Sequence, residues 1–267
     1  MKDITFSIVI LSFNSIKYLS HTLKSIDESV NKLQQPTEVY VVDNGSHDGS
    51  ADLLKGFSFN SSFVHYHSIF LEKNYGTTYS RNLALKKVTG EFIVIMDSDA
   101  YMNAESMDGL SQFLKNDPNC GLVAPKLIYP DGRLQLSVDL FPTIFNKIKR
   151  LFFLKKMEKN YQPLDTQIVE YAISAFWMFP KDILVKVGLL DEKIFYSPED
   201  VDFCIRIWKA GFNIAYVPHV FIVHDAQEIS RPKGFKIINR FSLSHAKGLL
   251  YLFIKHRYLF SPKFQSD

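Results

Sequence analysis

The stretch Gly90–Ala100, GEFIVIMDSDA, decides the fold. Its apolar run, Phe92–Met96, is typical of a fully buried strand, and the run stops at two acids separated by one residue. On an extended chain residues i and i+2 point the same way, so Asp97 and Asp99 can converge on one ligand. Carboxylate oxygens suit Mg2+ or Mn2+. An isolated pair of this kind is more often a solvated loop, but its position at a strand end makes a functional site an equal alternative.

Predicted strands and helices alternate along the chain up to this strand, which indicates an α/β fold with a mostly parallel open sheet. Before it the periodicity predicts strands over 6–12, 38–43 and 63–70, and helices over 19–33, 50–55 and 77–88. After it the pattern becomes α+β. We expect a helix over 104–115, a hairpin of 122–129 with 134–138, and helices over 181–187 and from Ser197-Pro198 to Gly211, with Pro198 as the first helical residue and a strand over 213–223 after them.

The composition is that of an ordinary globular protein, with 46% hydrophobic and 22% charged residues among 267. No apolar run is long enough to span a bilayer, and the N-terminus lacks the pattern of a secretory leader. We therefore expect a cytoplasmic protein. Cys120 and Cys204 are too few for a disulfide framework and match no zinc spacing.

The basic charge is concentrated in residues 231–267, which carry eight Lys or Arg and one acid, interleaved with apolar residues. This pattern predicts a domain over 1–230 and a basic amphipathic tail over 231–267 that binds the inner face of the cytoplasmic membrane through its anionic surface. The alternative is that the apolar residues pack as a last helix. Residues 145–159 pose a similar choice between a mobile amphipathic segment and a helix on the core. Nucleic acid is not expected as a partner, because no recognition module is visible.

Polar residues follow the first three predicted strands, at Asn14, at Asp43-Asn44-Gly45-Ser46 and at Asn74-Tyr75-Gly76. The carboxyl ends of neighbouring parallel strands line one crevice, where an Asp can accept hydrogen bonds from a ribose or a base. Glycine allows a close backbone approach. Taken alone, the Asp43-Asn44-Gly45 segment also fits a plain turn.

Six ordered blocks of the sequence resemble the inverting family 2 glycosyltransferases with the GT-A fold, especially bacterial rhamnosyltransferase-like members. The blocks are FSIVILSFN, VYVVDNGSHDGSADLL, EKNYGTTYSRNLAL, GEFIVIMDSDA, VGLLDEKIFYSPEDVDFCIRIWKAGFNIAYVP and the later His224, within residues 4–230. The resemblance implies that Asp43 contacts the nucleobase, Asp97 the nucleotide sugar and Asp99 the metal that bridges the diphosphate. It places Arg81 and Asn82 in the donor pocket, which we expect to include Asn14, Asn74, Gly76 and Ser98.

The acidic pair Glu199-Asp200 matches the family's pair at the start of a helix, where the second acid is the usual base that deprotonates the acceptor. Outside this context the pair would be read as a helix cap. In related enzymes a His at the position of His224 ligates the metal. Asp225 replaces a second His that is common there, so the alternative is that Asp225 instead binds the metal or orients a ligand. The chain also has Ser174 where the family often has Gly, and Pro198 where it often has Gly. Both positions border the acceptor region.

The sequence thus predicts a metal-dependent inverting transferase that uses Mg2+ or Mn2+ and moves a sugar from a UDP- or dTDP-linked donor to a hydroxyl in bacterial surface polysaccharide synthesis. The expected partners are the nucleoside diphosphate sugar and a glycan acceptor, which a lipid can carry. A sugar nucleotidyltransferase would need a Gly-rich basic loop after the first strand, where Ser12–Ser15 stands instead. The non-enzyme alternative is a catalytically inactive glycan-binding or assembly module on the same fold.

Overall fold

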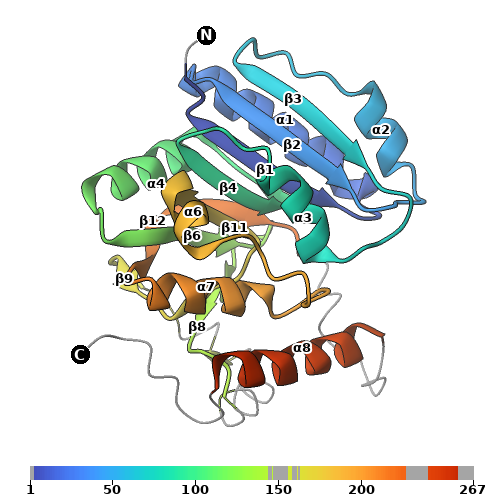
Figure 1. The fold of residues 1–267 in the computed structure, drawn as a ribbon. Helices are drawn as coiled ribbons and strands as arrows, with labels where there is room; N and C mark the ends of the chain where they lie inside the picture. Colours follow the sequence, from blue (N-terminus) through green and yellow to red (C-terminus); the bar gives the residue numbers. More distant parts are fainter. Residues whose placement is uncertain are drawn as a thin grey trace.

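The computed structural model of the chain describes residues 3–143, 146, 156–157, 161, 163–226 and 240–257. One ten-stranded sheet organises it, and eight of its strands follow the order β3-β2-β1-β4-β11-β6-β12-β5 (Figure 1). Its first half is parallel and alternates with helices. The elements are β1 (Phe6–Ser12), α1 (Ile16–Leu33), β2 (Thr37–Asp43), α2 (Ser50–Gly56), β3 (Val64–Phe70), α3 (Thr77–Leu85) and β4 (Phe92–Asp97).

The second half mixes parallel and antiparallel strands. Strand β11 (Phe176–Pro180) runs antiparallel between β4 and β6 (Cys120–Ile128), and β12 (Asn213–His224) is parallel to β6. Strand β5 (Ala100–Tyr101) pairs with the end of β12. The remaining elements are α4 (Ala104–Asn116), β7 (Leu134–Gln135), β8 (Val138–Asp139), β9 (Gln167–Ile168), β10 (Tyr171–Ala172), α6 (Lys181–Val187), α7 (Glu199–Lys209) and α8 (Arg240–His256).

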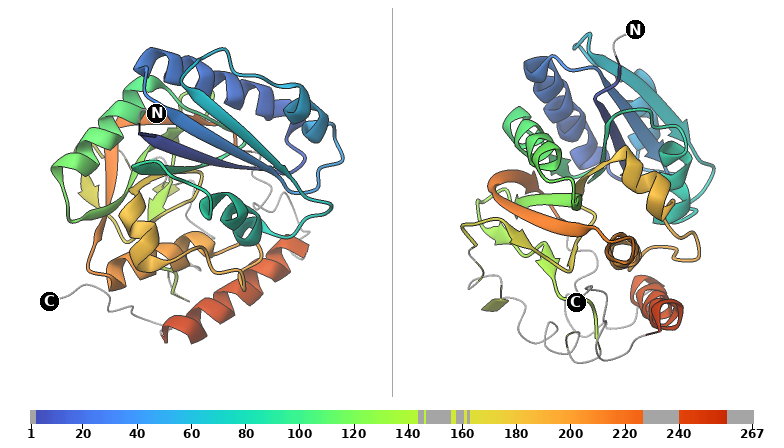
Figure 2. Two further views of the ribbon diagram at one scale, coloured as in Figure 1. Left: turned by 45° about the horizontal axis from the view of Figure 1, so that its top comes forward. Right: turned by 60° about the vertical axis from the view of Figure 1, so that its left-hand side comes forward.

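Two hydrophobic cores lie on the two faces of the sheet. Apolar residues of α1, α2 and α4 cover one face, and those of α3, α6 and α7 cover the other (Figure 2). This double cover explains why the residues of β4 up to Met96 are apolar on both sides, because a strand buried on both faces has no polar alternation. The predicted α/β architecture is confirmed.

The structure corrects two local predictions. Helix α7 begins at Glu199, so Pro198 is its N-cap and not its first helical residue, and the side chain of Ser197 instead shares a hydrogen bond with His245. The hairpin is shorter than predicted, because Leu134–Gln135 pair with β6 whereas Val138 pairs with β10. Nearly all of residues 145–159 lie outside the described residues. The choice there between a mobile amphipathic segment and a helix on the core is therefore not tested.

Helix α8 lies within the predicted tail and packs against α7 (Figures 1 and 2). Leu252 is fully buried in the core that α7 shares, and Lys255 and His256 contact the buried carboxylate of Asp202. The alternative of a last packed helix therefore holds for this segment. The division of the chain at residue 230 remains a prediction, and residues 231–239 and 258–267 lie outside the described part. No helix among the described residues has both the length and the apolar character needed to cross a membrane.

Candidate active site

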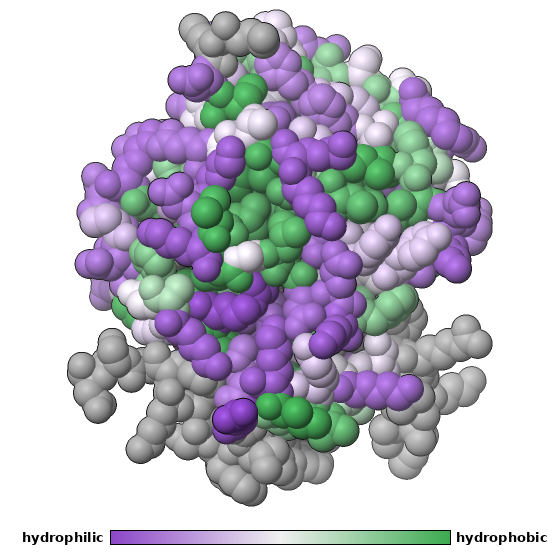
Figure 3. Space-filling view, in the orientation of Figure 1, coloured by the Kyte–Doolittle hydropathy of each residue, from purple (hydrophilic) through white to green (hydrophobic). Residues whose placement is uncertain are grey.

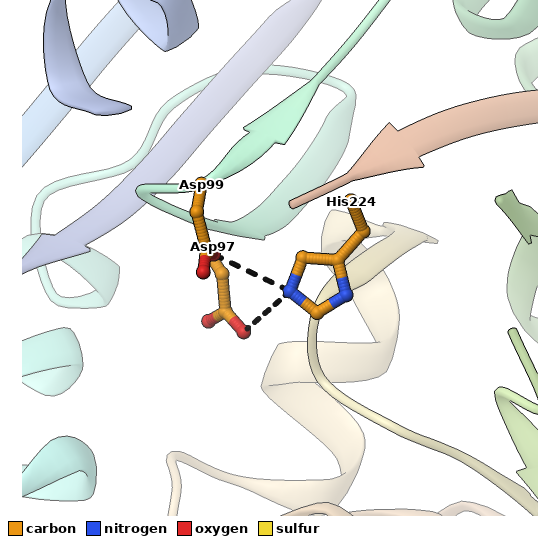
Figure 4. Close-up of side chains that lie close together, drawn as sticks. All are labelled: Asp97, Asp99 and His224. Atoms are coloured by element: carbon orange, nitrogen blue, oxygen red, sulfur yellow. Dashed lines mark ion pairs between the residues drawn. The ribbon is translucent and has the colours of Figure 1, made fainter. Parts of the chain in front are cut away.

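The predicted acids and histidine meet at the carboxyl edge of the sheet. Asp97 ends β4, Asp99 lies in the turn to β5, and the antiparallel pairing of β5 with β12 sets His224 opposite Ala100. One ligand atom from each of the three side chains lies within 4.8 Å of the others (Figure 4). His224 Nε2 is 3.3 Å from Asp99 Oδ1 and 3.9 Å from Asp97 Oδ2. The strand pairing, and not the sequence spacing, brings the histidine to the two carboxylates.

The second nitrogen of His224 is held by a buried amide. Nδ1 lies 2.8 Å from Oε1 of Gln135 on β7, and an amide oxygen can only accept, so Nδ1 carries the proton. The Nε2 lone pair then faces the two carboxylates, as a metal-binding imidazole requires. Burial lowers the pKa of His224, but Asp99 and Asp97 outweigh it and leave the pKa raised. These residues fit a small divalent cation with oxygen and nitrogen ligands.

Asp225, the alternative ligand, is directed elsewhere. Its backbone amide donates to the carbonyl of Asp99 at 2.9 Å, which continues the β5–β12 pairing. Burial, followed by the nearby charges of Asp225 and Asp99, raises the pKa of Tyr101 to about 12. Among the described residues the group suited to a metal consists of Asp97, Asp99 and His224.

Arg81 links this group to the acidic pair. Its guanidinium is almost fully buried, and it donates to Asp97 Oδ1 at 2.6 Å and to Ser174 Oγ at 3.0 Å. Ser174 in turn donates to Glu199 Oε1 at 3.0 Å, and Arg81 itself is 3.5 Å from the same oxygen. The strand-end acid and the first acid of α7 thus share one buried cation.

The acidic pair of α7 has two different environments. Glu199 is buried, and burial together with the neighbouring charge of Asp200 raises the pKa of Glu199 to about 8, although Arg81 opposes this. Asp200 is only partly buried, and its Oδ1 accepts from the amide of Val201 at 2.8 Å. Negative charge is favoured in the first turn of a helix. Asp200 is therefore the more accessible of the two acids, and Glu199 is the one that is locked to Arg81.

Asp43 lies at the same edge as Asp97, because β1 pairs Ser12 with Asp43 on one side and Leu11 with Asp97 on the other. Its Oδ1 accepts from the amide of Ser46 at 3.0 Å. Its Oδ2 is buried and has no hydrogen-bond partner among the described residues. An unsatisfied buried carboxylate oxygen is costly, and a donor group of a bound ligand would satisfy it.

Other predicted donor residues hold the loops of this edge together. Asn14 has a positive φ of 51°, its backbone amide donates to Ser46 Oγ, and its Oδ1 accepts from the amide of His47. Asn74 Oδ1 accepts from Asn44 Nδ2 at 3.0 Å. Gly76 has φ 92°, and any Cβ there would overlap with the backbone of Phe195. These contacts fix the loops at the carboxyl edge of the sheet.

Two further predicted residues make contacts away from the Asp97-Asp99-His224 group. The backbone carbonyl of Ser98 accepts from Thr22 Oγ1 of α1 at 2.6 Å. The amide of Asn82 is engaged by Leu190 and Glu192, with Nδ2 donating to both and Oδ1 accepting from the amide of Leu190. Asn82 therefore supports the loop between α6 and α7.

Four residues were not identified as site residues from the sequence. Gln135 carries no motif signal, because a buried amide in a hairpin is usually structural. Asn44 stands in the Asp43-Asn44-Gly45 segment, which alone also fits a plain turn, and was not assigned a role of its own. Ser174 was noted as a departure from the family, and its hydroxyl bridges Arg81 and Glu199. Tyr196 is mostly buried beside this cluster, and burial followed by the charge of Asp97 raises its pKa to about 12. Its position directly before Ser197-Pro198 was the only available signal.

Known proteins resemble the chain in sequence and in fold. The chain is 22% identical over 242 residues to the cholesterol galactosyltransferase of Borreliella burgdorferi, covering 89% of this chain and 64% of that protein. It is 22% identical over 245 residues to the N-acetylglucosaminyl-diphospho-decaprenol L-rhamnosyltransferase of Mycobacterium tuberculosis, covering 81% and 75%. The chain thus spans about two thirds to three quarters of the length of these relatives.

A solved structure shows the same fold. The mannosyltransferase PcManGT from Pyrobaculum calidifontis, solved with GDP-Man and Mn2+, superposes with a TM-score of 0.65 at 19% identity, over 97% of this chain and 66% of that one. At this identity the likeness concerns the fold alone. The model of the family described as "Glycosyl transferase family 2" matches residues 7–188. That match covers well over half of the chain, which therefore belongs to glycosyl transferase family 2.

Proposed function

We propose that the chain is a metal-dependent inverting glycosyltransferase that moves a sugar from a nucleoside diphosphate sugar, linked to UDP or dTDP, to a hydroxyl of a bacterial surface glycan. The observation that carries the proposal is the continuous polar network from the Asp97-Asp99-His224 group through Arg81 and Ser174 to the acidic pair of α7. A leaving-group site and a base would need to lie on either side of the transferred sugar.

The donor would bind along the carboxyl edge of the sheet. Asp43 would accept a hydrogen bond from the nucleobase, because its Oδ2 is buried and has no hydrogen-bond partner in the described structure. Asp97, Asp99 and His224 would hold Mg2+ or Mn2+, which supplies positive charge to the departing diphosphate. The relative that shares the fold was solved with GDP-Man and Mn2+, which supports a nucleotide-sugar donor and a divalent metal.

Asp200 would act as the base. The acceptor oxygen attacks the anomeric carbon while the bond from that carbon to the diphosphate oxygen breaks, and the acceptor proton passes to the Asp200 carboxylate. One displacement inverts the anomeric centre. Glu199 is locked to Ser174 and Arg81, so its role in this scheme is to orient the first turn of α7 and to keep Arg81 against Asp97.

We also place the enzyme on an anionic membrane surface, where a lipid-linked acceptor would lie. The support comes from the outward face of α8, where Leu250 is 61% exposed and Ile254 is 68% exposed. The exposed Lys247 lies on the same helix, three residues before Leu250, and the exposed Arg257 directly follows the last helical residue, His256. Figure 3 shows hydrophobic surface in the region of α8 with hydrophilic residues beside it.

A donor panel tests the proposal. Purified protein is offered UDP- and dTDP-sugars with a glycan acceptor, and released nucleoside diphosphate is measured with Mn2+, with Mg2+ and with excess EDTA. Turnover should require the metal, and Asp99→Ala should lower it about a thousandfold or more, since several kcal/mol of charge stabilisation disappear. Asp108→Ala, at an exposed acid of α4, is the matched control.

Two outcomes would count against the proposal. Full turnover in excess EDTA would remove the metal from the mechanism. Donor binding without transfer to any acceptor would instead favour the inactive glycan-binding or assembly module.

A further inference from the structure

Helix α8 presents one continuous face to the loop and helix that carry the acidic pair. His245, Gly248, Leu252 and Lys255-His256 recur at steps of three and four, so they lie on one side of the helix. Leu252 is fully buried in the core shared with α7. The remaining members of this face make polar or backbone contacts with residues on both sides of Glu199-Asp200.

The contact before the acidic pair is close and backbone-directed. A Cβ at Gly248 would overlap with the carbonyl oxygen of Ser197 and would come within 2.9 Å of Pro198 Cδ. His245 Nδ1 and Ser197 Oγ share a hydrogen bond of 2.9 Å. Glycine in a helix interior is unfavourable, so its presence here is explained by the approach of α8 to Ser197-Pro198.

The contact after the acidic pair is ionic. Asp202 is fully buried in the first turn of α7, and its Oδ1 lies 2.6 Å from Lys255 Nζ and 2.8 Å from His256 Nε2. Lys255 also pairs with Asp191 at 2.6 Å, and Tyr251 donates to the same Asp191 oxygen at 2.9 Å. The loop from Asp191 to Pro198 and the first turn of α7 are thus fixed by the same helix.

We propose that α8 is a positioning element for Asp200. The contacts at Ser197-Pro198 and at Asp202 flank the acidic pair, so a shift of α8 would rotate or displace Asp200 relative to the acceptor. Donor binding should change less than transfer, because α8 supplies none of Asp43, Asp97, Asp99 and His224 and is linked to Asp97 through Glu199 and Arg81. This inference rests on the proposed function, since it concerns the step in which Asp200 takes the acceptor proton.

Gly248→Ala tests the proposal in the full chain. The new methyl group pushes α8 away from Ser197, so kcat for transfer should fall at least tenfold while the affinities for Mn2+ and for the donor nucleotide change less than twofold. Thermal stability should fall as well, because the overlap with a backbone oxygen exceeds what the better helix propensity of alanine offsets, so the readout is the loss of kcat relative to donor affinity in the folded variant. Gly56→Ala is the matched control, because a Cβ there meets nothing within 4 Å.

His245 supplies a second, independent variant. His245→Ala removes the bond to Ser197 without adding volume and should lower kcat several-fold with unchanged donor affinity, and His245→Asn should restore much of the loss. If Gly248→Ala fails to fold, the comparison of His245→Ala with His245→Asn tests the positioning role instead. Wild-type kcat in His245→Ala, or an equal loss of donor binding and kcat in both variants, would overturn the positioning role. A wild-type protein without transfer activity would instead refute the proposed function.

Discussion

Arg81 shows at the scale of one residue how this site is assembled. Its buried guanidinium contacts Asp97, Ser174 and Glu199, which come from β4, the segment before β11 and the start of α7. A buried cation is tolerated only when carboxylates and hydrogen bonds satisfy it, and removal of one partner leaves the others uncompensated. Arg81 therefore constrains the distance between Asp97, on the proposed donor side, and Glu199, beside the proposed base.

Glu199 and Asp200 should respond differently to amide substitution. We expect Asp200→Asn to retain donor binding and to lose transfer about a hundredfold or more, because the amide cannot take the acceptor proton. Glu199→Gln keeps a group that can accept from Ser174 and should retain more activity. Rates of transfer and equilibrium binding of the donor nucleotide are measured for both. If Glu199→Gln is inactive and Asp200→Asn remains active, Glu199 and not Asp200 is the base.

Gln135 offers a prediction that the family motif does not contain. Gln135→Leu removes the acceptor for His224 Nδ1–H, so the imidazole loses its fixed orientation, and we expect Mn2+ affinity to fall about tenfold to a hundredfold. Calorimetric titration with Mn2+ measures this change, and Gln112→Leu at an exposed position of α4 is the control. Unchanged affinity in Gln135→Leu would exclude Gln135 as a support of the metal site.

The sequence predicted the candidate metal ligands of the site, but it did not predict the residues that hold the site together. Asp97, Asp99 and His224 were predicted from a strand end and from the family blocks, and the structure brings them together. Gln135 and Ser174 could not be identified, because their roles depend on contacts between segments far apart in the chain. A polar side chain in a short hairpin or before a strand has many possible partners, and sequence alone does not select among them.

At the scale of elements, the parallel half of the sheet follows directly from its sequence pattern. Continuous apolar runs bounded by turns predicted β1, β2 and β4 to within one or two residues. The antiparallel insertion of β11 between β4 and β6 was not predicted, since local pattern carries no information on strand order. This insertion brings Ser174, two residues before β11, to Arg81.

The contact between α7 and α8 should depend on pH. Burial raises the pKa of Asp202, but His256, Arg206 and Lys255 outweigh it and bring the pKa from 3.8 to about 2. The unfolded chain therefore takes up this proton first as the pH falls. The stabilisation is fully present above about pH 4 and is lost as the pH falls through about 2, which amounts to about 2 kcal/mol.

Urea unfolding of wild type and of Asp202→Asn between pH 5 and pH 2 measures this linkage. The free energy of unfolding of wild type should decrease by about 2 kcal/mol more than that of the variant over this range. Parallel curves for the two proteins would show that Asp202 does not titrate with folding.

At the scale of the whole molecule, the segment between α6 and α7 is held from two sides. From α3, the amide of Thr77 donates to Phe195 and the hydroxyl of Thr78 donates to Ile194. From α8, Lys255 pairs with Asp191. The segment that leads to the acidic pair therefore joins the parallel half of the sheet to the C-terminal helix. A ligand on the outer side of α8 would act on the same segment.

Substitutions on the outer face of α8 can change membrane affinity without removing the contacts of its inner face. With Leu252 buried and Lys255 paired to Asp191 and Asp202, truncation of the whole tail would also remove part of the core. Substitution of the outward residues Leu250 and Ile254 leaves those contacts in place. Point variants therefore separate membrane affinity from folding, which truncation at residue 230 would not.

We expect the full chain to float with anionic vesicles at low salt and to release them at high salt. Each Lys or Arg near an anionic leaflet contributes about 1 kcal/mol, and this attraction is screened as the Debye length falls from about 10 Å at 0.1 M to about 3 Å at 1 M salt. The double variant Leu250→Ser with Ile254→Ser should weaken flotation without a change in helical circular dichroism, whereas Val185→Ser, at a 78% exposed position of α6, should not. Neutral vesicles should bind poorly in every case. If wild type does not bind anionic vesicles at low salt, the basic C-terminal segment has a structural role and the membrane is not its partner.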